Sequence, residues 1–133
     1  MQKRNMIVAV DFDGTCCEHE YPNIGATVPH CIEVLKKIIQ FGHQIMIYTM
    51  RDGKELEDAK NWYIQNGIPF TAANENIDAW SKSKKLYAHI YIDDAAIGCP
   101  LITEKYPGTF LHKRSYVDWF KVEKLLEDKG LFY

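Results

Sequence analysis

Two pairs of acidic residues stand directly after apolar runs in this sequence. Asp11 and Asp13 follow one run, and Asp93 and Asp94 follow another. Such runs predict buried parallel strands, and side chains two residues apart on a strand leave the same face. Carboxylates brought together at a buried strand end are costly unless a cation neutralises them, so the pairs indicate a divalent metal site that serves chemistry. The alternative for the first pair is an ordinary Asp-Gly turn.

The pattern of apolar residues predicts an alternation of strands and helices along the chain. We expect strands over 6–12, 44–49 and 88–92, and helices over 29–41, 52–66 and 116–129. Asp52 with Glu55 predicts a capping box for the second helix, and Ser115 with Asp118 predicts the start of the third. A further strand-like run lies at 109–111.

This order predicts an α/β fold: a three-layer α/β/α sandwich with a mostly parallel, Rossmann-like sheet. In such folds, ligands bind outside the carboxyl ends of the strands. Asp11, Thr49 and Asp93 all stand at these ends. We therefore expect three separate strands to deliver polar side chains to one edge of the sheet.

Size and composition are those of one ordinary globular domain, which we expect to span 1–133. The chain has 133 residues, of which 47% are hydrophobic and 26% charged. A net charge of −2 gives no general attraction to polyanions, so nucleic acid is not indicated. The short basic pair Lys113-Arg114 is typical of solvated surface.

The cysteines and the apolar stretches predict a cytoplasmic protein. The four cysteines have neither a C-x-x-C nor a zinc-site spacing and are expected to be reduced thiols; they are Cys16, Cys17, Cys31 and Cys99. No apolar stretch approaches the ~20 residues of a membrane span, so no membrane partner is expected.

At this point the motifs resemble a known family. The segment 11–15 reads Asp-Phe-Asp-Gly-Thr, which is similar to the D-x-D-G-T signature of the haloacid dehalogenase (HAD) superfamily. Thr49 closes a strand as the second motif of that family does. Lys85, eight residues before Asp93, and the Asp93-Asp94 pair resemble the third and fourth motifs. The resemblance covers residues 6 to about 98 and implies a HAD-type hydrolase.

The resemblance implies a role for each motif residue. Asp11 would be the nucleophile that forms an aspartyl-phosphate, and Asp13 the general acid and then the base that activates water. Thr49 would bind the phosphoryl group, and Lys85 would neutralise its charge, with Lys84 as the alternative lysine. The magnesium ligands would be Asp11, Asp93, Asp94 and the backbone carbonyl of Asp13, an all-oxygen set that suits Mg²⁺.

The residues beside the motifs are expected to meet the substrate. These are Gly14, which lets the chain turn sharply, Thr15, Met50 and Arg51. Arg51 could hold a substrate anion in bidentate fashion, or form a surface ion pair with Glu55. His19, in the loop after the first motif, could contact substrate or be exposed to solvent.

The acid at position 13 and the Asp93-Asp94 pair favour a Mg²⁺-dependent phosphatase over a metal-free dehalogenase. The gaps between motifs are too short for a folded cap domain, so the resemblance is to a capless member with an open site. We therefore expect a phosphorylated substrate that is large or a phosphosugar, or a homo-oligomer in which a neighbour completes the site. A phospho-acceptor without hydrolysis, or an interaction protein on this fold, are the alternatives.

Overall fold

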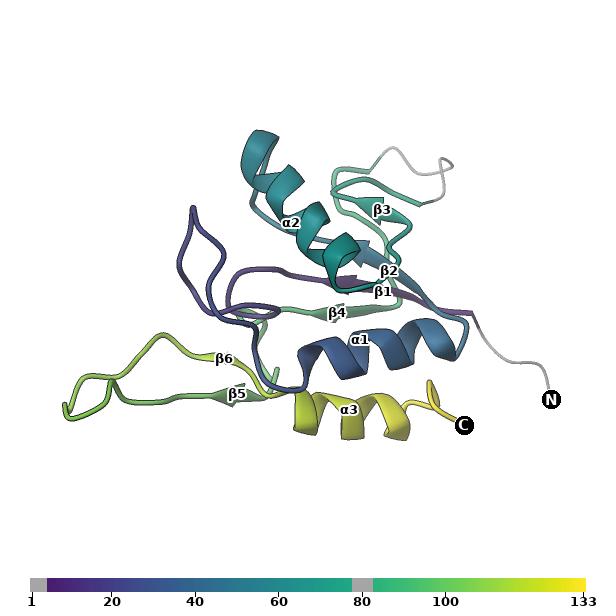
Figure 1. Ribbon diagram of the computed structural model, residues 1–133. Coiled ribbons are helices and arrows are strands. Elements are labelled where there is room, and N and C mark those ends of the chain that lie inside the picture. Colours follow the sequence, from purple (N-terminus) through teal and green to yellow (C-terminus); the bar gives the residue numbers. More distant parts are fainter. Residues whose placement is uncertain (1–4, 78–82) are drawn as a thin grey trace.

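The computed structural model describes residues 5–77 and 83–133. Strands and helices alternate over most of the chain (Figure 1). The elements are β1 (Ile7–Val10), α1 (Cys31–Gln40), β2 (Gln44–Ile47), α2 (Gly53–Gln65), β3 (Ala72–Ala73), β4 (Ile90–Ile92), β5 (Leu101–Ile102), β6 (Tyr116–Val117) and α3 (Trp119–Asp128).

A parallel four-stranded sheet in the order β3-β2-β1-β4 forms the centre of the fold. Val10, the last residue of β1, is level with Ile47 of β2 and Ile92 of β4. Because the strands are parallel, the residues that follow them meet at one edge of the sheet. The chain steps from β1 to β2 and β3, then returns to place β4 on the other side of β1. In sheets of this kind, the crevice for ligands lies where the strand order reverses, which is here between β1 and β4.

The two faces of the sheet are covered by different parts of the chain. Val8 and Val10 belong to the main core, which they share with buried residues of all three helices. Ile7 and Ala9 face the other way, as the two-residue period of a strand requires. The residues that cover them from the connection between β3 and β4 are Ile77, Leu86 and Ala88. The sheet is thus the middle layer between the helices and this connection, which contains no helix in its described residues.

The predicted α/β class with a parallel, Rossmann-like sheet is confirmed, and no cap domain is inserted within the described ranges. The capping interactions predicted for two helices are wrong, although Asp52 is the N-cap residue at which the second helix begins, as predicted. Asp52 precedes α2, but its side chain makes no capping hydrogen bond, so the box with Glu55 is not formed. The cap of α3 is Asp118 rather than Ser115, because the Asp118 carboxylate accepts a hydrogen bond from Lys121 N at 3.2 Å.

β5 and β6 form a long antiparallel hairpin that was not predicted. Leu101 pairs with Val117, and the Ser115 and Thr103 hydroxyls are hydrogen-bonded at 2.6 Å. The run 109–111, predicted as a strand, lies instead in the turn region of this hairpin. The hairpin extends away from the sheet (Figure 1).

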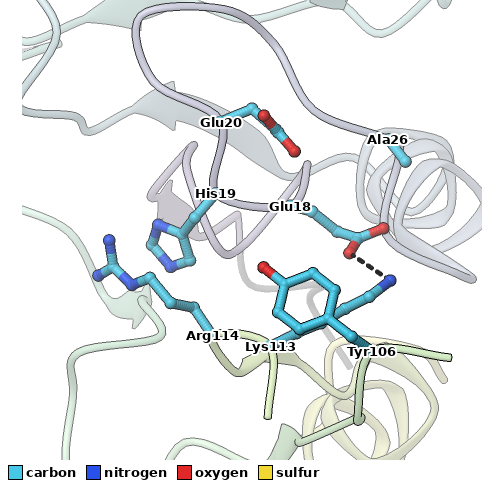
Figure 2. Close-up of a pocket in the computed structure, with 7 residues that line it drawn as sticks. All are labelled: Glu18, His19, Glu20, Ala26, Tyr106, Lys113 and Arg114. Atoms are coloured by element: carbon cyan, nitrogen blue, oxygen red, sulfur yellow. Dashed lines mark ion pairs between the residues drawn. The ribbon is translucent and has the colours of Figure 1, made fainter. Parts of the chain in front are cut away.

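Contacts with the loop after β1 fix the direction of the hairpin. Val117 N donates to Gly14 O at 3.0 Å. Just after the hairpin, Trp119 Nε1 at the start of α3 donates to Thr15 O at 2.7 Å. Farther out, Lys113 Nζ lies 3.5 Å from a carboxylate oxygen of Glu18 (Figure 2). The hairpin therefore forms a wall beside the loop that carries the first motif.

All four cysteines are free thiols, as predicted. Cys16, Cys17 and Cys31 are buried, and Cys99 is half-buried. None of the helices in residues 5–77 and 83–133 has the length and apolar character needed to span a bilayer.

Candidate active site

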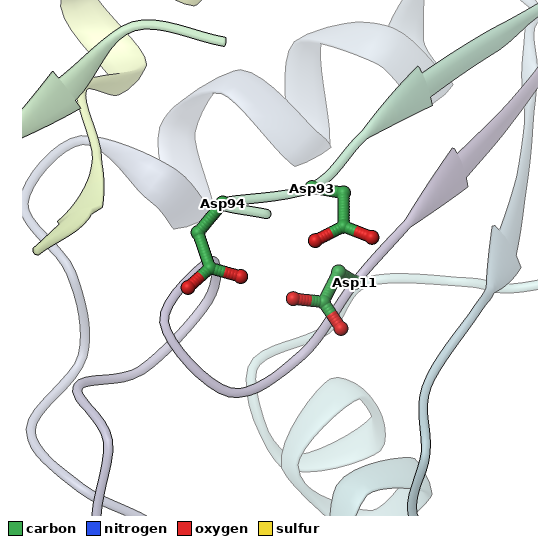
Figure 3. Close-up of side chains that lie close together, drawn as sticks. All are labelled: Asp11, Asp93 and Asp94. Carbon is green, nitrogen blue, oxygen red and sulfur yellow. The ribbon is translucent and has the colours of Figure 1, made fainter. Parts of the chain in front are cut away.

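Three carboxylates meet at the edge of the sheet between β1 and β4. One oxygen each of Asp11, Asp93 and Asp94 lies within 4.8 Å of the others (Figure 3). The strand register accounts for this, because Asp11 and Asp93 follow residues that are paired across β1 and β4. A backbone hydrogen bond of 2.9 Å from Asp11 N to Ile92 O fixes the two strand ends together. The predicted meeting of the two acidic pairs is therefore correct for these three residues.

The surroundings of Asp11 favour a bound cation. Thr15 Oγ1 donates to Asp11 Oδ2 at 2.9 Å and accepts from Asp94 N at 3.2 Å. Burial, the hydrogen bond with Asp94 and the charge of Asp93 raise the pKa of Asp11 from 3.8 to about 8. A metal-free cluster therefore takes up a proton near neutral pH. The donors are all carboxylate oxygens, the set that Mg²⁺ and similar hard cations prefer, so the residues fit the predicted metal.

Asp13 and Arg51 form a buried ion pair. Arg51 Nε and one terminal nitrogen donate to the two carboxylate oxygens of Asp13, both at 2.8 Å. The Arg51 side chain is only 1% exposed, and the hydrogen bond with Asp13 raises the pKa of the guanidinium. The Asp13 side chain therefore faces Arg51 and not the three-carboxylate cluster. To transfer a proton to or from a substrate, the Asp13 carboxylate would have to leave this pair.

The other donors of Arg51 are also occupied. They donate to the backbone carbonyls of Pro22, Asn23 and Glu55 at 2.9 to 3.3 Å. All five N–H groups of the guanidinium are thus used inside the protein. Arg51 does not present its guanidinium to a substrate anion, and it contacts the backbone of Glu55 instead of its carboxylate. Both predictions for this residue are wrong. Arg51 instead joins Asp13 to the loop after β1 through its hydrogen bonds to the carbonyls of Pro22 and Asn23.

Thr49 organises the turn after β2. Its hydroxyl accepts from Arg51 N at 3.1 Å, while its own N–H donates to Asn74 Oδ1 at 2.9 Å. Asn74 also donates to Arg51 O at 3.1 Å and has a positive φ of 54°. Its position after β3, level with the other strand ends, was the available signal for this residue. Met50 is 98% exposed at the turn.

Lys85 is not brought into the acidic cluster by this structure. Its Nζ lies over the ring of Tyr91, 5.6 Å from the centroid, and within the described residues it pairs with no carboxylate. Lys84 is exposed on the same segment. The roles assigned to these lysines by the resemblance therefore stay predictions.

Comparison with known proteins gives one informative relative. No model of a protein family matches the chain, and no curated protein matches it. The solved structure of a conserved protein from Bacteroides thetaiotaomicron is 32% identical, with 96% of this chain and 93% of that chain covered and a TM-score of 0.77. The chain belongs to the family of this conserved protein. The description of the Bacteroides protein states no activity, so the relationship supports the fold and leaves function to the site.

In the present protein, His19 contacts the acidic cluster through Asp94, an interaction that the sequence did not reveal. Its Nε2 lies 2.9 Å from Asp94 Oδ2, with both side chains about 15% exposed. Gly14 makes room for this contact, because a Cβ at Gly14 would lie 2.1 Å from His19 Nε2 and 2.4 Å from Asp94 Oδ2. The contact spans 75 positions in sequence, which is why no local pattern announces it.

The assembled site can hold a hard cation beside a carboxylate that is mostly shielded from water. Asp11 is held by Thr15 on one oxygen, and His19 holds Asp94. A nearby acid, Asp13, is kept in an ion pair. This combination suits chemistry on an anionic oxyacid, since a cation stabilises its negative oxygens and a carboxylate attacks its electrophilic centre.

Proposed function

We propose that the protein is a Mg²⁺-dependent phosphatase that hydrolyses a phosphomonoester through an aspartyl-phosphate on Asp11. The observation that carries the proposal is the cluster of Asp11, Asp93 and Asp94 at the point where the strand order reverses. The D-x-D-G-T motif at 11–15 and its resemblance to the HAD superfamily support the same assignment.

The first step transfers the phosphoryl group to the protein. A carboxylate oxygen of Asp11 attacks phosphorus, and the bond from phosphorus to the leaving oxygen breaks. Asp13, which has left Arg51 and taken up a proton as the substrate binds, gives that proton to the leaving oxygen. When bound, Mg²⁺ supplies positive charge against the phosphoryl oxygens, and its ligands would be Asp11, Asp93 and Asp94. In the second step, water attacks phosphorus while Asp13 takes a proton from it. The bond between phosphorus and the Asp11 oxygen breaks, which frees the Asp11 carboxylate and inorganic phosphate.

Thr15, Thr49 and Arg51 have supporting roles in this proposal. Thr15 holds the orientation of Asp11 through the 2.9 Å hydrogen bond. Thr49 and the neighbouring exposed Met50 lie on the turn at the same edge of the sheet. The Thr49 hydroxyl, which accepts from Arg51 N, would donate its own proton to a phosphoryl oxygen. Arg51 keeps Asp13 in place until the substrate is bound.

The second candidate is a phospho-acceptor that forms the aspartyl-phosphate and does not hydrolyse it. The observation that favours it is the Asp13–Arg51 pair. An Asp13 that never leaves Arg51 could not activate water, so the phosphoryl group would persist on Asp11.

The test is hydrolysis of p-nitrophenyl phosphate with Mg²⁺ and with EDTA, using the wild-type protein and Asp11→Asn. Asp128→Asn, at an exposed position in α3, is the matched control for the same chemical change. We expect Mg²⁺-dependent release in the wild type and the control, and none in Asp11→Asn. Release that survives in Asp11→Asn would contradict the mechanism, and a stable phosphoprotein without release would favour the phospho-acceptor.

A further inference from the structure

A polar cavity lies next to the acidic cluster, between the loop after β1 and the β5–β6 hairpin. Its volume is about 250 Å³, and its lining includes Glu18, His19, Glu20, Tyr106, Lys113 and Arg114 (Figure 2). His19 connects the two places, because its ring lines the cavity while its Nε2 is bonded to Asp94. A group in this cavity would therefore sit one imidazole ring away from the candidate metal site.

Two segments that are distant in sequence build the walls, and contacts hold them in position. The Lys113–Glu18 ion pair joins the walls at 3.5 Å. On the hairpin, Lys113 N donates to Glu104 O at 2.7 Å and Tyr106 N donates to Leu111 O at 2.8 Å. The cavity is thus bounded on both sides by segments whose positions are fixed by hydrogen bonds and an ion pair.

The charges in the lining balance. Glu18 is already paired with Lys113, which leaves Glu20 and Arg114 as charges of opposite sign without an ion-pair partner in residues 5–77 and 83–133. A second anionic group would be repelled by Glu20, and a cationic group by Arg114. A neutral group with both donors and acceptors can hydrogen-bond to the Glu20 carboxylate and to the Arg114 guanidinium, and hydroxyl groups have this property.

We propose that this cavity binds the leaving group of the substrate, and that this leaving group is rich in hydroxyl groups, as in a sugar or polyol. Arg114 donates to its hydroxyl oxygens, Glu20 accepts from its hydroxyl protons, and the Tyr106 ring offers an apolar face to its C–H groups. The volume, just below the ~300 Å³ at which small-molecule sites usually begin, suits one small unit and not a polymer. The proposal rests on the phosphatase function and names the substrate class for that site.

The first experiment compares D-glucose 6-phosphate with p-nitrophenyl phosphate, which presents the same phosphoryl group on an aromatic leaving group. The variants are Arg114→Ala and Glu20→Gln, both at exposed positions. Lys105→Ala is the control, since Lys105 is an exposed cation of the same hairpin that does not line the cavity. We expect Arg114→Ala and Glu20→Gln to raise KM for glucose 6-phosphate about tenfold more than KM for p-nitrophenyl phosphate, as loss of a charged hydrogen-bond partner implies. Lys105→Ala should leave both values unchanged.

Two results would overturn the proposal. Equal changes in KM for both substrates would show that these side chains do not recognise the leaving group. A larger loss in Arg114→Ala for D-fructose 1,6-bisphosphate than for glucose 6-phosphate would show an anion subsite instead of a hydroxyl subsite.

A binding measurement separates this proposal from the phosphatase function. In Mg²⁺-loaded Asp11→Asn, which should not turn over, NMR shifts of His19 and Tyr106 report glucose 6-phosphate directly. Binding that is weakened by Arg114→Ala supports the subsite even if the wild type hydrolyses nothing. Hydrolysis of p-nitrophenyl phosphate together with no binding of glucose 6-phosphate would overturn the subsite and leave the phosphatase function standing.

Discussion

Replacing Asp11 by asparagine should stabilise the metal-free protein at neutral pH. The pKa of this carboxyl is raised from 3.8 to about 8, first by burial and then by Asp94 and Asp93. The folded protein therefore holds a proton there that the unfolded chain gives up. The contribution of this carboxyl to the free energy of unfolding is therefore present in full below about pH 4 and is lost as the pH rises towards 8. An amide at position 11 removes this dependence because it does not titrate.

The size of the effect follows from proton linkage. One proton held only by the folded state changes the free energy of unfolding by about 1.4 kcal/mol per pH unit. Between pH 5 and pH 7, within the window set by the raised pKa of Asp11, the metal-free wild type should lose about 2 to 3 kcal/mol more than Asp11→Asn. Typical domains have a total stability of about 5 to 15 kcal/mol, so this difference is readily measured.

The assay is urea unfolding in EDTA at pH 5, 6 and 7 for the wild type, Asp11→Asn and the exposed control Asp128→Asn. Saturation with Mg²⁺ at 100 times its dissociation constant should then restore about 2.7 kcal/mol to the wild type and less to Asp11→Asn. Parallel pH profiles for the wild type and Asp11→Asn would refute the reasoning, because they would show that the carboxyl of Asp11 titrates normally.

Three further substitutions test the contacts around the cluster. Gly14→Ala should destabilise the protein by about 1 to 3 kcal/mol in urea unfolding and weaken Mg²⁺ binding, since its φ is +79° and a Cβ would strike His19 and Asp94. Gly67→Ala, with φ of +69° and open space around it, is the control, and an equal loss of Mg²⁺ affinity there would contradict the steric argument. His19→Ala should lower Mg²⁺ affinity about tenfold by calorimetry because it frees the Asp94 carboxylate, whereas unchanged affinity would show that the contact does not orient Asp94. Arg51→Met should cost about 3 to 5 kcal/mol because it leaves the Asp13 carboxylate unpaired, and Asp13→Asn in the same protein should recover part of this. A loss no larger than in Lys54→Met, at an exposed residue, would show that the pair contributes little.

The approximate strand ends were predictable from the sequence because apolar residues recur with one period in strands and another in helices. Apolar runs with acids after them predicted the end of β4 at Ile92 and the end of β1 to within two residues, and parallel pairing then brought Asp11 and Asp93 together. β2 ends at Ile47, two residues before the predicted end at Thr49, and the Thr49 hydroxyl serves the turn that follows the strand.

The loop contacts were not predictable in the same way. The pairs Arg51–Asp13 and His19–Asp94 depend on the paths of irregular segments, which no periodic pattern encodes. The hairpin was missed because its strands are only two residues long, while the more strand-like run 109–111 falls in its turn. Lys113 and Arg114 consequently read as ordinary surface, although they line the cavity beside the site.

The most direct test of the central claim is whether Asp11 carries the phosphoryl group during turnover. The wild-type protein is mixed with Mg²⁺ and p-nitrophenyl phosphate, quenched in acid within the first turnovers, digested and analysed by mass spectrometry. The proposed mechanism predicts one added phosphoryl group on the peptide that contains Asp11, absent with EDTA and decaying as inorganic phosphate appears. Turnover with no phosphoryl group on that peptide, or with the group on another residue, would contradict it.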